Sequence, residues 1–222
     1  DADGDALAVE PSVAVTAAEP GEPELATPDE PEDADAPADA GDAVDDDAAA
    51  EPGPPALTED QRRELQLLLS VLRTNQLDAE QRRLAAEALL GRGWQEAVGA
   101  MAADLRNGEA STRRLIAEAV ARTSDPPAGL VEPLLAALAS QSVDLREAVA
   151  SALARYPADT IIPPLIERAL SPDSPEPLRH GAIRALAEHR DPRAVETLIT
   201  LLDGRRREST RRAAFVALAR LT

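Results

Sequence analysis

Cysteine and lysine are absent from this sequence, and its only aromatic residues are Trp94, Tyr156 and Phe215. Without cysteine, disulfides, thiolate metal sites and cysteine nucleophiles are excluded. The three aromatic residues are far apart in the sequence, whereas stacking on nucleic-acid bases requires clustered rings. No apolar run reaches the roughly 20 residues that a membrane-spanning helix needs. These absences exclude cysteine chemistry and a transmembrane helix, and they argue against nucleic-acid binding.

Charge is distributed unevenly along the chain. Residues 1–60 contain 20 acidic residues and no basic residue, whereas residues 61–222 contain 21 acidic residues and all 23 arginines. Residues 1–56 are mainly Asp, Glu, Ala and Pro, and such a segment cannot bury enough apolar surface to offset the entropy of ordering it. We therefore predict a disordered acidic linker at 1–56, acting as a solubilising spacer or as an acidic docking segment, and a folded array at 57–222.

One pattern, an arginine followed by apolar residues at +3, +6 and +7, occurs five times in the predicted array. The spacing places the apolar residues on one face of a helix, and alanine at +6 in every copy lets a neighbouring helix approach closely. The copies are separated by intervals of 31, 33, 33 and 32 residues and begin at Arg82, Arg113, Arg146, Arg179 and Arg211. Intervals this regular are typical of stacked helical repeats.

A second helical pattern, with aliphatic residues at 0, +3, +4 and +7, precedes each copy of the first. It begins at Leu65, Val98, Val131, Ile162 and Val195. Because the two patterns alternate in one register, we predict an all-α solenoid of five helix pairs, with approximate repeats at 57–91, 92–124, 125–157, 158–190 and 191–222. The last repeat has the ordinary internal pattern, so we expect the array to continue or to be capped beyond Thr222.

Capping residues indicate where several helices begin and end. Thr58 to Gln61 forms a capping box, Leu77-Asp78 opens the second helix, and Gly91 to Gly93 ends it in a left-handed conformation. Further N-caps are predicted at Asp125, Ser142, Thr160, Ser174 and Asp191. With Thr160 as the cap, Pro163 and Pro164 occupy the third and fourth helical positions, where a missing amide costs little.

This alternation resembles HEAT repeats, and more closely the short bacterial repeats related to phycobilisome lyases. The segments that carry the resemblance are a proline-containing first helix at 131–135 and 162–166, an inter-repeat turn at 191–195, and the Leu-Arg openings of the second helix at 145–146 and 178–179. The resemblance implies a right-handed solenoid whose second helices line the concave face. It also implies a ladder of Asp-Arg bonds between repeats, for which only Asp173 is suitably placed.

The candidate partner-binding residues form a row of arginines in the first turn of the second helices. Stacked in register, they would make a basic stripe along one edge of the concave face. The members are Arg82, Arg83, Arg113, Arg114, Arg146, Arg179, Arg211 and Arg212. In the competing interpretation, each arginine pairs with the adjacent repeat or with a nearby acid, namely Glu80, Glu109, Asp144, Glu176 or Glu208.

Residues suited to catalysis or metal binding are scarce. The two histidines, His180 and His189, are nine residues apart and do not converge on one helix face, and no glycine-rich phosphate loop or Ser-His-Asp grouping occurs. We therefore predict a non-enzymatic scaffold without metal or cofactor that binds a protein partner on its concave face. The alternative is a lyase-like or chaperone-like accessory factor for a chromophore-bearing or other protein, although without cysteine this chain cannot hold a bilin through a thioether.

The first residue, Asp1, is not methionine. An exported or cell-envelope protein that has lost an upstream signal or anchor is the preferred interpretation, and a fragment of a longer cytoplasmic protein is the other. A third candidate function, less favoured than the scaffold and the accessory factor, is nucleic-acid binding through the arginine stripe. It predicts that binding depends steeply on salt concentration.

Overall fold

The computed structural model describes residues 56–221, which contain ten α-helices, one 3₁₀ helix and no strand. The predicted linker at 1–56 lies outside the described residues, apart from Ala56. The helices are α1 Glu59–Arg73, α2 Ala79–Arg92, α3 Gln95–Asn107, α4 Ala110–Arg122, η1 Ala128–Leu130, α5 Val131–Ala137, α6 Val143–Leu153, α7 Ala158–Leu170, α8 Glu176–His189, α9 Pro192–Thr200 and α10 Glu208–Ala219. The all-α prediction is confirmed.

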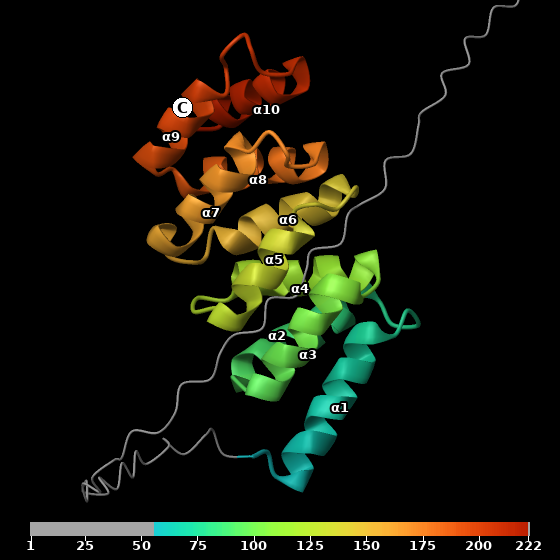
Figure 1. Cartoon of the computed structure of the whole chain (residues 1–222). Helices are drawn as coiled ribbons and strands as arrows, with labels where there is room; N and C mark the ends of the chain where they lie inside the picture. The colour runs from blue at the N-terminus through green and yellow to red at the C-terminus, as the bar shows by residue number, and fades with distance from the viewer. Residues whose placement is uncertain (1–55, 222) are drawn as a thin grey trace, which may run out of the picture. The chain divides into compact units, whose positions relative to one another are not determined.

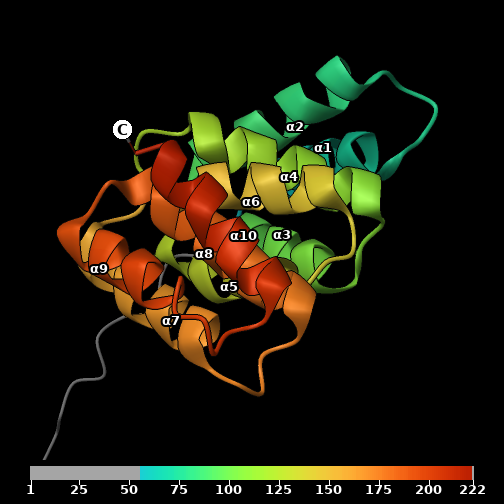
Figure 2. The same ribbon diagram turned by 90° about the horizontal axis from the view of Figure 1, so that it is seen from above.

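The helices stack as successive pairs, from α1 and α2 at one end of the array to α9 and α10 at the other (Figure 1). The even-numbered helices form one layer, in which α2 contacts α4, α4 contacts α6, α6 contacts α8, and α8 contacts α10. In the view from above, α3, α5, α7 and α9 lie in a second layer beside it (Figure 2). We call the layer of α2, α4, α6, α8 and α10 the B layer. The fold is an α-solenoid, as the periodicity predicts.

The core is built from the apolar columns of the repeat pattern. In α6 the +3, +6 and +7 residues are Val149, Ala152 and Leu153, and all three are completely buried. The equivalent residues of α8 are buried to the same extent. Burying a side chain the size of leucine or valine contributes about 1.5–3 kcal/mol, so the sum over the stacked columns is the main source of stability.

Several predicted helix ends are confirmed. The hydroxyl of Thr58 accepts the Gln61 amide, while the Gln61 side chain accepts the Thr58 amide at 2.9 Å, which completes the capping box. Gly93 ends α2 with a φ of 64°, a conformation that glycine adopts without strain. Ser142 and Asp191 cap α6 and α9 through their side chains.

The predicted cap at Asp125 is wrong. The chain remains extended through Pro126 and Pro127, a 3₁₀ turn follows, and α5 begins only at Val131. The physical reason is the paired prolines: a residue that precedes proline is disfavoured in the helical region, so Pro126 cannot start a helix before Pro127.

The predicted caps at Thr160 and Ser174 are also wrong. Helix α7 already begins at Ala158, because its amides at 160 and 161 bond to the Pro157 carbonyl, and packing of the fully buried Ile161 and Ile162 sets its register. Pro163 and Pro164 are therefore inside the helix rather than in its first turn. Helix α8 begins after Pro175, whose carbonyl accepts the Arg179 amide at 3.0 Å.

The last described repeat leaves apolar side chains uncovered. Phe215 on α10 is 65% exposed, whereas Ile183, the equivalent residue of α8, is 1% exposed because α10 packs over it. On α9, Ile199 is 57% exposed.

Candidate functional site

In α2, α4, α6 and α8, the first arginine of the helix binds its own repeat. Arg82 donates from Nε to the Leu72 carbonyl at 3.0 Å, and Arg113 donates to the Leu105 carbonyl at 2.9 Å. Arg146 binds the carbonyls of residues 140 and 141, and Arg179 binds those of residues 171, 172 and 174, all at 2.6–3.0 Å. The last carbonyls of a helix lack helical donors, and a cation complements that end of the dipole. These arginines therefore hold the end of one helix against the start of the next.

These arginines are part of the interior rather than a free stripe. Arg82 and Arg179 are 6% and 7% exposed. Arg82 also reaches the next repeat, where its Nη2 donates to the Thr112 hydroxyl at 2.9 Å. Arg211, the fifth copy, has a buried Nε without a hydrogen-bond partner among the described residues.

The predicted pairing of this first column with nearby acids is not observed. None of the five first-column arginines forms an ion pair within residues 56–221, and Arg179 contacts carbonyls around Asp173 rather than a carboxylate. Salt bridges between repeats do occur elsewhere, for example between Arg73 and Asp104 at 2.9 Å. The Asp-Arg ladder implied by the resemblance is therefore not formed at Asp173.

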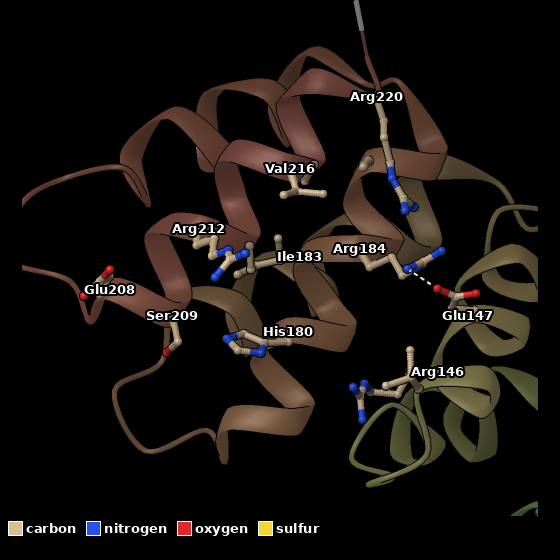
Figure 3. A pocket seen from close by; sticks show the side chains of 14 residues that line it. Arg146, Glu147, His180, Ile183, Arg184, Glu208, Ser209, Arg212, Val216 and Arg220 are labelled. Carbon is tan, nitrogen blue, oxygen red and sulfur yellow. Dashed lines mark ion pairs between the residues drawn. The ribbon is translucent and has the colours of Figure 1, made fainter.

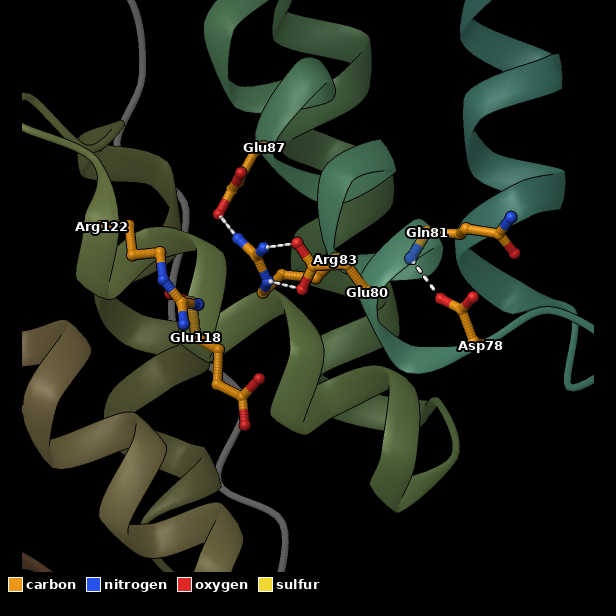
Figure 4. Close-up of polar contacts among 7 residues, drawn as sticks. All are labelled: Asp78, Glu80, Gln81, Arg83, Glu87, Glu118 and Arg122. Carbon is orange, nitrogen blue, oxygen red and sulfur yellow. Dashed lines mark hydrogen bonds and ion pairs between the residues drawn. The ribbon is translucent and has the colours of Figure 1, made fainter.

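A second column, one residue further along each B-layer helix, is partly exposed in α2 to α8 and exposed in α10. Arg83 binds both Glu80 and Glu87 (Figure 4), and the hydrogen bonds that its guanidinium donates to Glu80 are the main reason that the pKa of Arg83 is raised. Arg114 lies 3.7 Å from Glu118. The equivalent position is Glu147 in α6, His180 in α8 and Arg212 in α10. Arg212 is exposed and has no partner within the described residues.

The residue one helical turn after each second-column residue determines whether that second-column side chain is paired with an acid that follows it on its own helix. At +5 from the first arginine, α2 and α4 carry Glu87 and Glu118, which pair with the arginines at +1. In α6, α8 and α10 the same position holds Ser151, Arg184 and Val216. The B layer therefore changes along the array, from arginines paired with an acid on their own helix to Arg184 and Arg212, which form no ion pair within their own helices.

A groove of about 540 Å³ lies where this change occurs, between α6, α8 and α10 (Figure 3). Its apolar lining consists of Val143, Ile183, Ala187, Ala213, Val216 and Ala217. Its charged lining consists of four arginines and two glutamates, namely Arg146, Arg184, Arg212, Arg220, Glu147 and Glu208. We call it the C-terminal groove. It combines an apolar wall with excess positive charge.

Two of the cations in the C-terminal groove have partners on neighbouring helices. Arg184 crosses to Glu147 on α6, at 2.5 Å (Figure 3), and Arg220 lies 3.9 Å from Glu188 on α8. The Nε of Arg184 is buried and has no acceptor within the described residues. Positive charge at Arg212 is thus uncompensated, and Arg184 retains an unused donor.

A second groove of similar volume lies between α4, α6 and α8 and serves as an internal comparison. Its charged lining comprises three arginines and three acids, namely Arg114, Arg122, Arg184, Glu118, Asp144 and Glu147. Its only apolar lining residues are Ala121 and Ala148. We call it the central groove. Because its charges balance and its apolar wall is small, it offers less to a ligand than the C-terminal groove does.

Both histidines lie on α8 but in different surroundings. His180 lines the C-terminal groove, 3.7 Å from Glu176, whereas His189 is the last residue of the helix. Burial lowers the pKa of both, and in His180 the nearby Arg146 and Arg179 lower it further while Glu176 opposes them. Within residues 56–221, no group of three or more His, Asp or Glu side chains is arranged to hold a metal ion, and no helix is long and apolar enough to cross a bilayer.

Sequence reasoning missed Arg184 and Arg220 as groove residues. The predicted row selected arginines by their place at the start of each helix, whereas these two lie one and two turns further along. Comparison of the +5 column between repeats would have revealed Arg184 and Val216, since both replace a glutamate found in the first two repeats.

Similarity to known proteins agrees with the α-solenoid architecture. Residues 131–219 match the family described as HEAT repeats. This region comprises α5 to α10 and therefore contains every lining residue of the C-terminal groove except Arg220. No curated protein matches the chain. The closer resemblance to phycobilisome-lyase repeats stays a prediction.

Proposed function

We propose that this chain is a non-enzymatic protein-interaction scaffold that binds its partner on the B-layer face, at the C-terminal groove. HEAT repeats commonly serve as interaction scaffolds, and the region that matches them contains all the lining residues of this groove except Arg220. The observation that carries the proposal is the +5 column: the glutamate that neutralises Arg83 and Arg114 in the first repeats is replaced by Val216 beside Arg212. The replacement leaves an apolar surface next to a free cation, a combination that an interface can use.

Only part of the predicted arginine row is available to bind a partner at the C-terminal groove. Arg82, Arg113, Arg146 and Arg179 use their guanidinium groups on carbonyls of the array itself. Continuous phosphate binding along the whole stripe would need those groups to be free. Arg211 and Arg212 have no internal side-chain partner in the described part of the chain, and Arg212 is the exposed one of the two, so we propose it as the row's main contribution to partner binding.

The proposal can be tested with three versions of the full chain as bait: wild type, Val216→Glu and Leu84→Glu. Val216 and Leu84 are similarly exposed, at 48% and 51%, and both lie in B-layer helices, but Leu84 is outside both grooves. Val216→Glu restores the glutamate at +5 and gives Arg212 an intrahelical partner. A partner of the C-terminal groove is captured by wild type and Leu84→Glu and lost with Val216→Glu. Capture that is the same for all three baits contradicts the proposed location.

A further inference from the structure

The C-terminal groove follows the helical repeat of α10. Its lining residues on this helix recur every four positions as adjacent pairs, from Glu208 and Ser209, through Arg212 and Ala213 and then Val216 and Ala217, to Arg220. Twelve residues at 1.5 Å per residue give a length of about 18 Å, or slightly more than three helical turns. The groove is therefore an elongated channel parallel to a helix, with a length that suits a short helical segment.

The wall of the groove permits close approach of a backbone. Its exposed or partly exposed apolar side chains are Val143, Ala213 and Val216, whereas Ile183, Ala187 and Ala217 line it but are at most 5% exposed. Small residues on facing helices bring the helix axes close together, and an incoming helix places its own larger aliphatic side chains over them.

The charged residues that line the C-terminal groove favour a negatively charged occupant. Its four arginines exceed its two glutamates, and Arg212 has no partner among the described residues. Arg184 has a buried Nε without an acceptor, although its Nη1 binds Glu147. Carboxylates on an occupant would bind Arg212 and the partly exposed end of the Arg184 side chain through charge-assisted hydrogen bonds, whereas an ammonium group would be repelled.

We propose that the C-terminal groove binds an acidic amphipathic helix of a partner protein, about three turns long. Aliphatic residues of that helix pack on Val143, Ala213 and Val216, and its flanking carboxylates bind Arg212 and the exposed part of Arg184. This inference rests on the proposed scaffold function and deepens it, because it states the chemistry of the partner.

The exposure of the groove wall favours a macromolecular occupant over a small molecule. Val143 and Val216 line the groove and are 55% and 48% exposed. Small-molecule sites enclose most of their ligand, and a ligand confined to this groove would leave both valines in water. A helix lying along α10 covers them. A nucleic acid would meet an apolar wall without Phe, Tyr or Trp, which offers no base stacking.

The probe for this inference is a library of 15-residue alanine-rich helical peptides. Four neighbouring positions on one face carry Leu, Gln, Glu or Lys in all combinations, and binding to the full chain is measured by fluorescence anisotropy at low salt. The expected binders have leucine one turn apart with adjacent glutamate, and they bind at least tenfold more tightly than the same peptides with lysine for glutamate. The difference should shrink at 0.5 M salt, where charges are screened beyond about 4 Å.

Variants of the protein locate the binding. Arg212→Glu and Val216→Glu should weaken the acidic peptides at least tenfold, Arg212→Glu should favour the lysine peptides, and Leu84→Glu should change neither. Circular dichroism melts establish that each variant is folded. Arg212 and Val216 are exposed, so these changes do not disturb the core.

Three results would overturn the inference: equal binding of acidic and basic peptides, no binding by any member of the library, or binding unaffected by Arg212→Glu and Val216→Glu. Oleate and an oligothymidine of 20 nucleotides are tested in parallel, and binding of either one at these residues without any acidic-helix binding also overturns it. If the library fails while a captured protein depends on Val216, the scaffold proposal stands and only the helical, acidic occupant is wrong.

Discussion

Gly181 in α8 packs directly against Leu138, the residue that follows α5. A Cβ atom built on Gly181 would lie 2.8 Å from the Leu138 carbonyl oxygen and 3.0 Å from its Cβ. Backbone atoms cannot move aside as the end of a side chain can, so α8 approaches the preceding repeat this closely only because residue 181 has no side chain.

We expect Gly181→Ala to lower the free energy of unfolding by about 1–3 kcal/mol, the usual cost of overpacking. This loss opposes the gain of up to about 1 kcal/mol that alanine brings within a helix. The matched control is Gly99→Ala in α3, where no atom lies within 4 Å of the added methyl group and the change should stabilise the array. Urea denaturation measures both. Stabilisation by both substitutions would contradict the close contact.

The carbonyl bonds of the first-column arginines provide a second prediction. Arg179→Met should destabilise the array by about 1–3 kcal/mol, because the carbonyls of residues 171, 172 and 174 lose a buried donor that binds them at 2.8–3.0 Å. Arg179→Lys should destabilise the array almost as much as Arg179→Met, since an ammonium group cannot reproduce the planar set of donors of the guanidinium. Arg114→Met removes only a 3.7 Å ion pair between partly exposed side chains and should change stability by less than about 0.5 kcal/mol. Equal losses at 114 and 179 would show that the carbonyl bonds add nothing.

The parts of the fold that could be predicted from the sequence are those in which the local preferences of the residues and their packing in the folded array favour the same structure. Ala185 is completely buried, as its place at +6 predicts, because a period of 3.6 residues fixes which face of a helix meets its neighbour. Thr58 and Asp191 are caps because each has one available helix start beside it. The site was harder to find, because a run of arginines carries the same sequence signal whether the guanidinium binds a carbonyl, as at Arg179, or faces a groove, as at Arg212.

Helix α7 shows where tertiary packing overrides the local signal. The two prolines at 163 and 164 favour a helix that begins late enough to place them in the first turn. The burial of Ile161 and Ile162 instead extends the helix back to Ala158. A sequence pattern alone cannot weigh the apolar area buried by two isoleucines against the hydrogen bonds lost at two prolines.

The position of Pro163 inside α7 leads to a third prediction. Proline in a helix interior costs about 3 kcal/mol through the missing amide and ring clash, while it saves about 0.4–1 kcal/mol by restricting the unfolded chain. Pro163 is exposed, so its ring adds little packing. Pro163→Ala should therefore stabilise the array by about 2 kcal/mol. Pro192 is the first residue of α9, where proline is favoured, and Pro192→Ala should be neutral or destabilising. A loss of stability in Pro163→Ala would indicate that the helix begins after Ala158.

The last prediction concerns pH. Burial lowers the pKa of His180 and His189 below their ordinary value of 6.5. Between the lowered folded value and 6.5 the unfolded chain binds more protons than the folded chain, so stability increases with pH in that window. The contribution of the neutral imidazoles is complete above about pH 6.5 and is lost as the pH falls through the folded pKa values. The thermal midpoint should therefore decrease from pH 7.5 to pH 5, and the double variant His180→Gln, His189→Gln should show a flatter profile.

Asp191 provides the internal reference for this measurement. Hydrogen bonds from Arg193 lower the pKa of Asp191 to about 2, so its contribution persists through the histidine window and is lost only as the pH falls from about 4 toward 2. Asp191→Asn should reduce the slope below pH 4, and, because the Asp191 carboxylate raises the pKa of the nearby His189, it should slightly steepen the slope between pH 7.5 and pH 5. If the histidine variant and wild type have identical profiles above pH 5, the two imidazoles are not buried in the neutral form, and the surroundings of His180 in the C-terminal groove are more hydrated than the structure indicates.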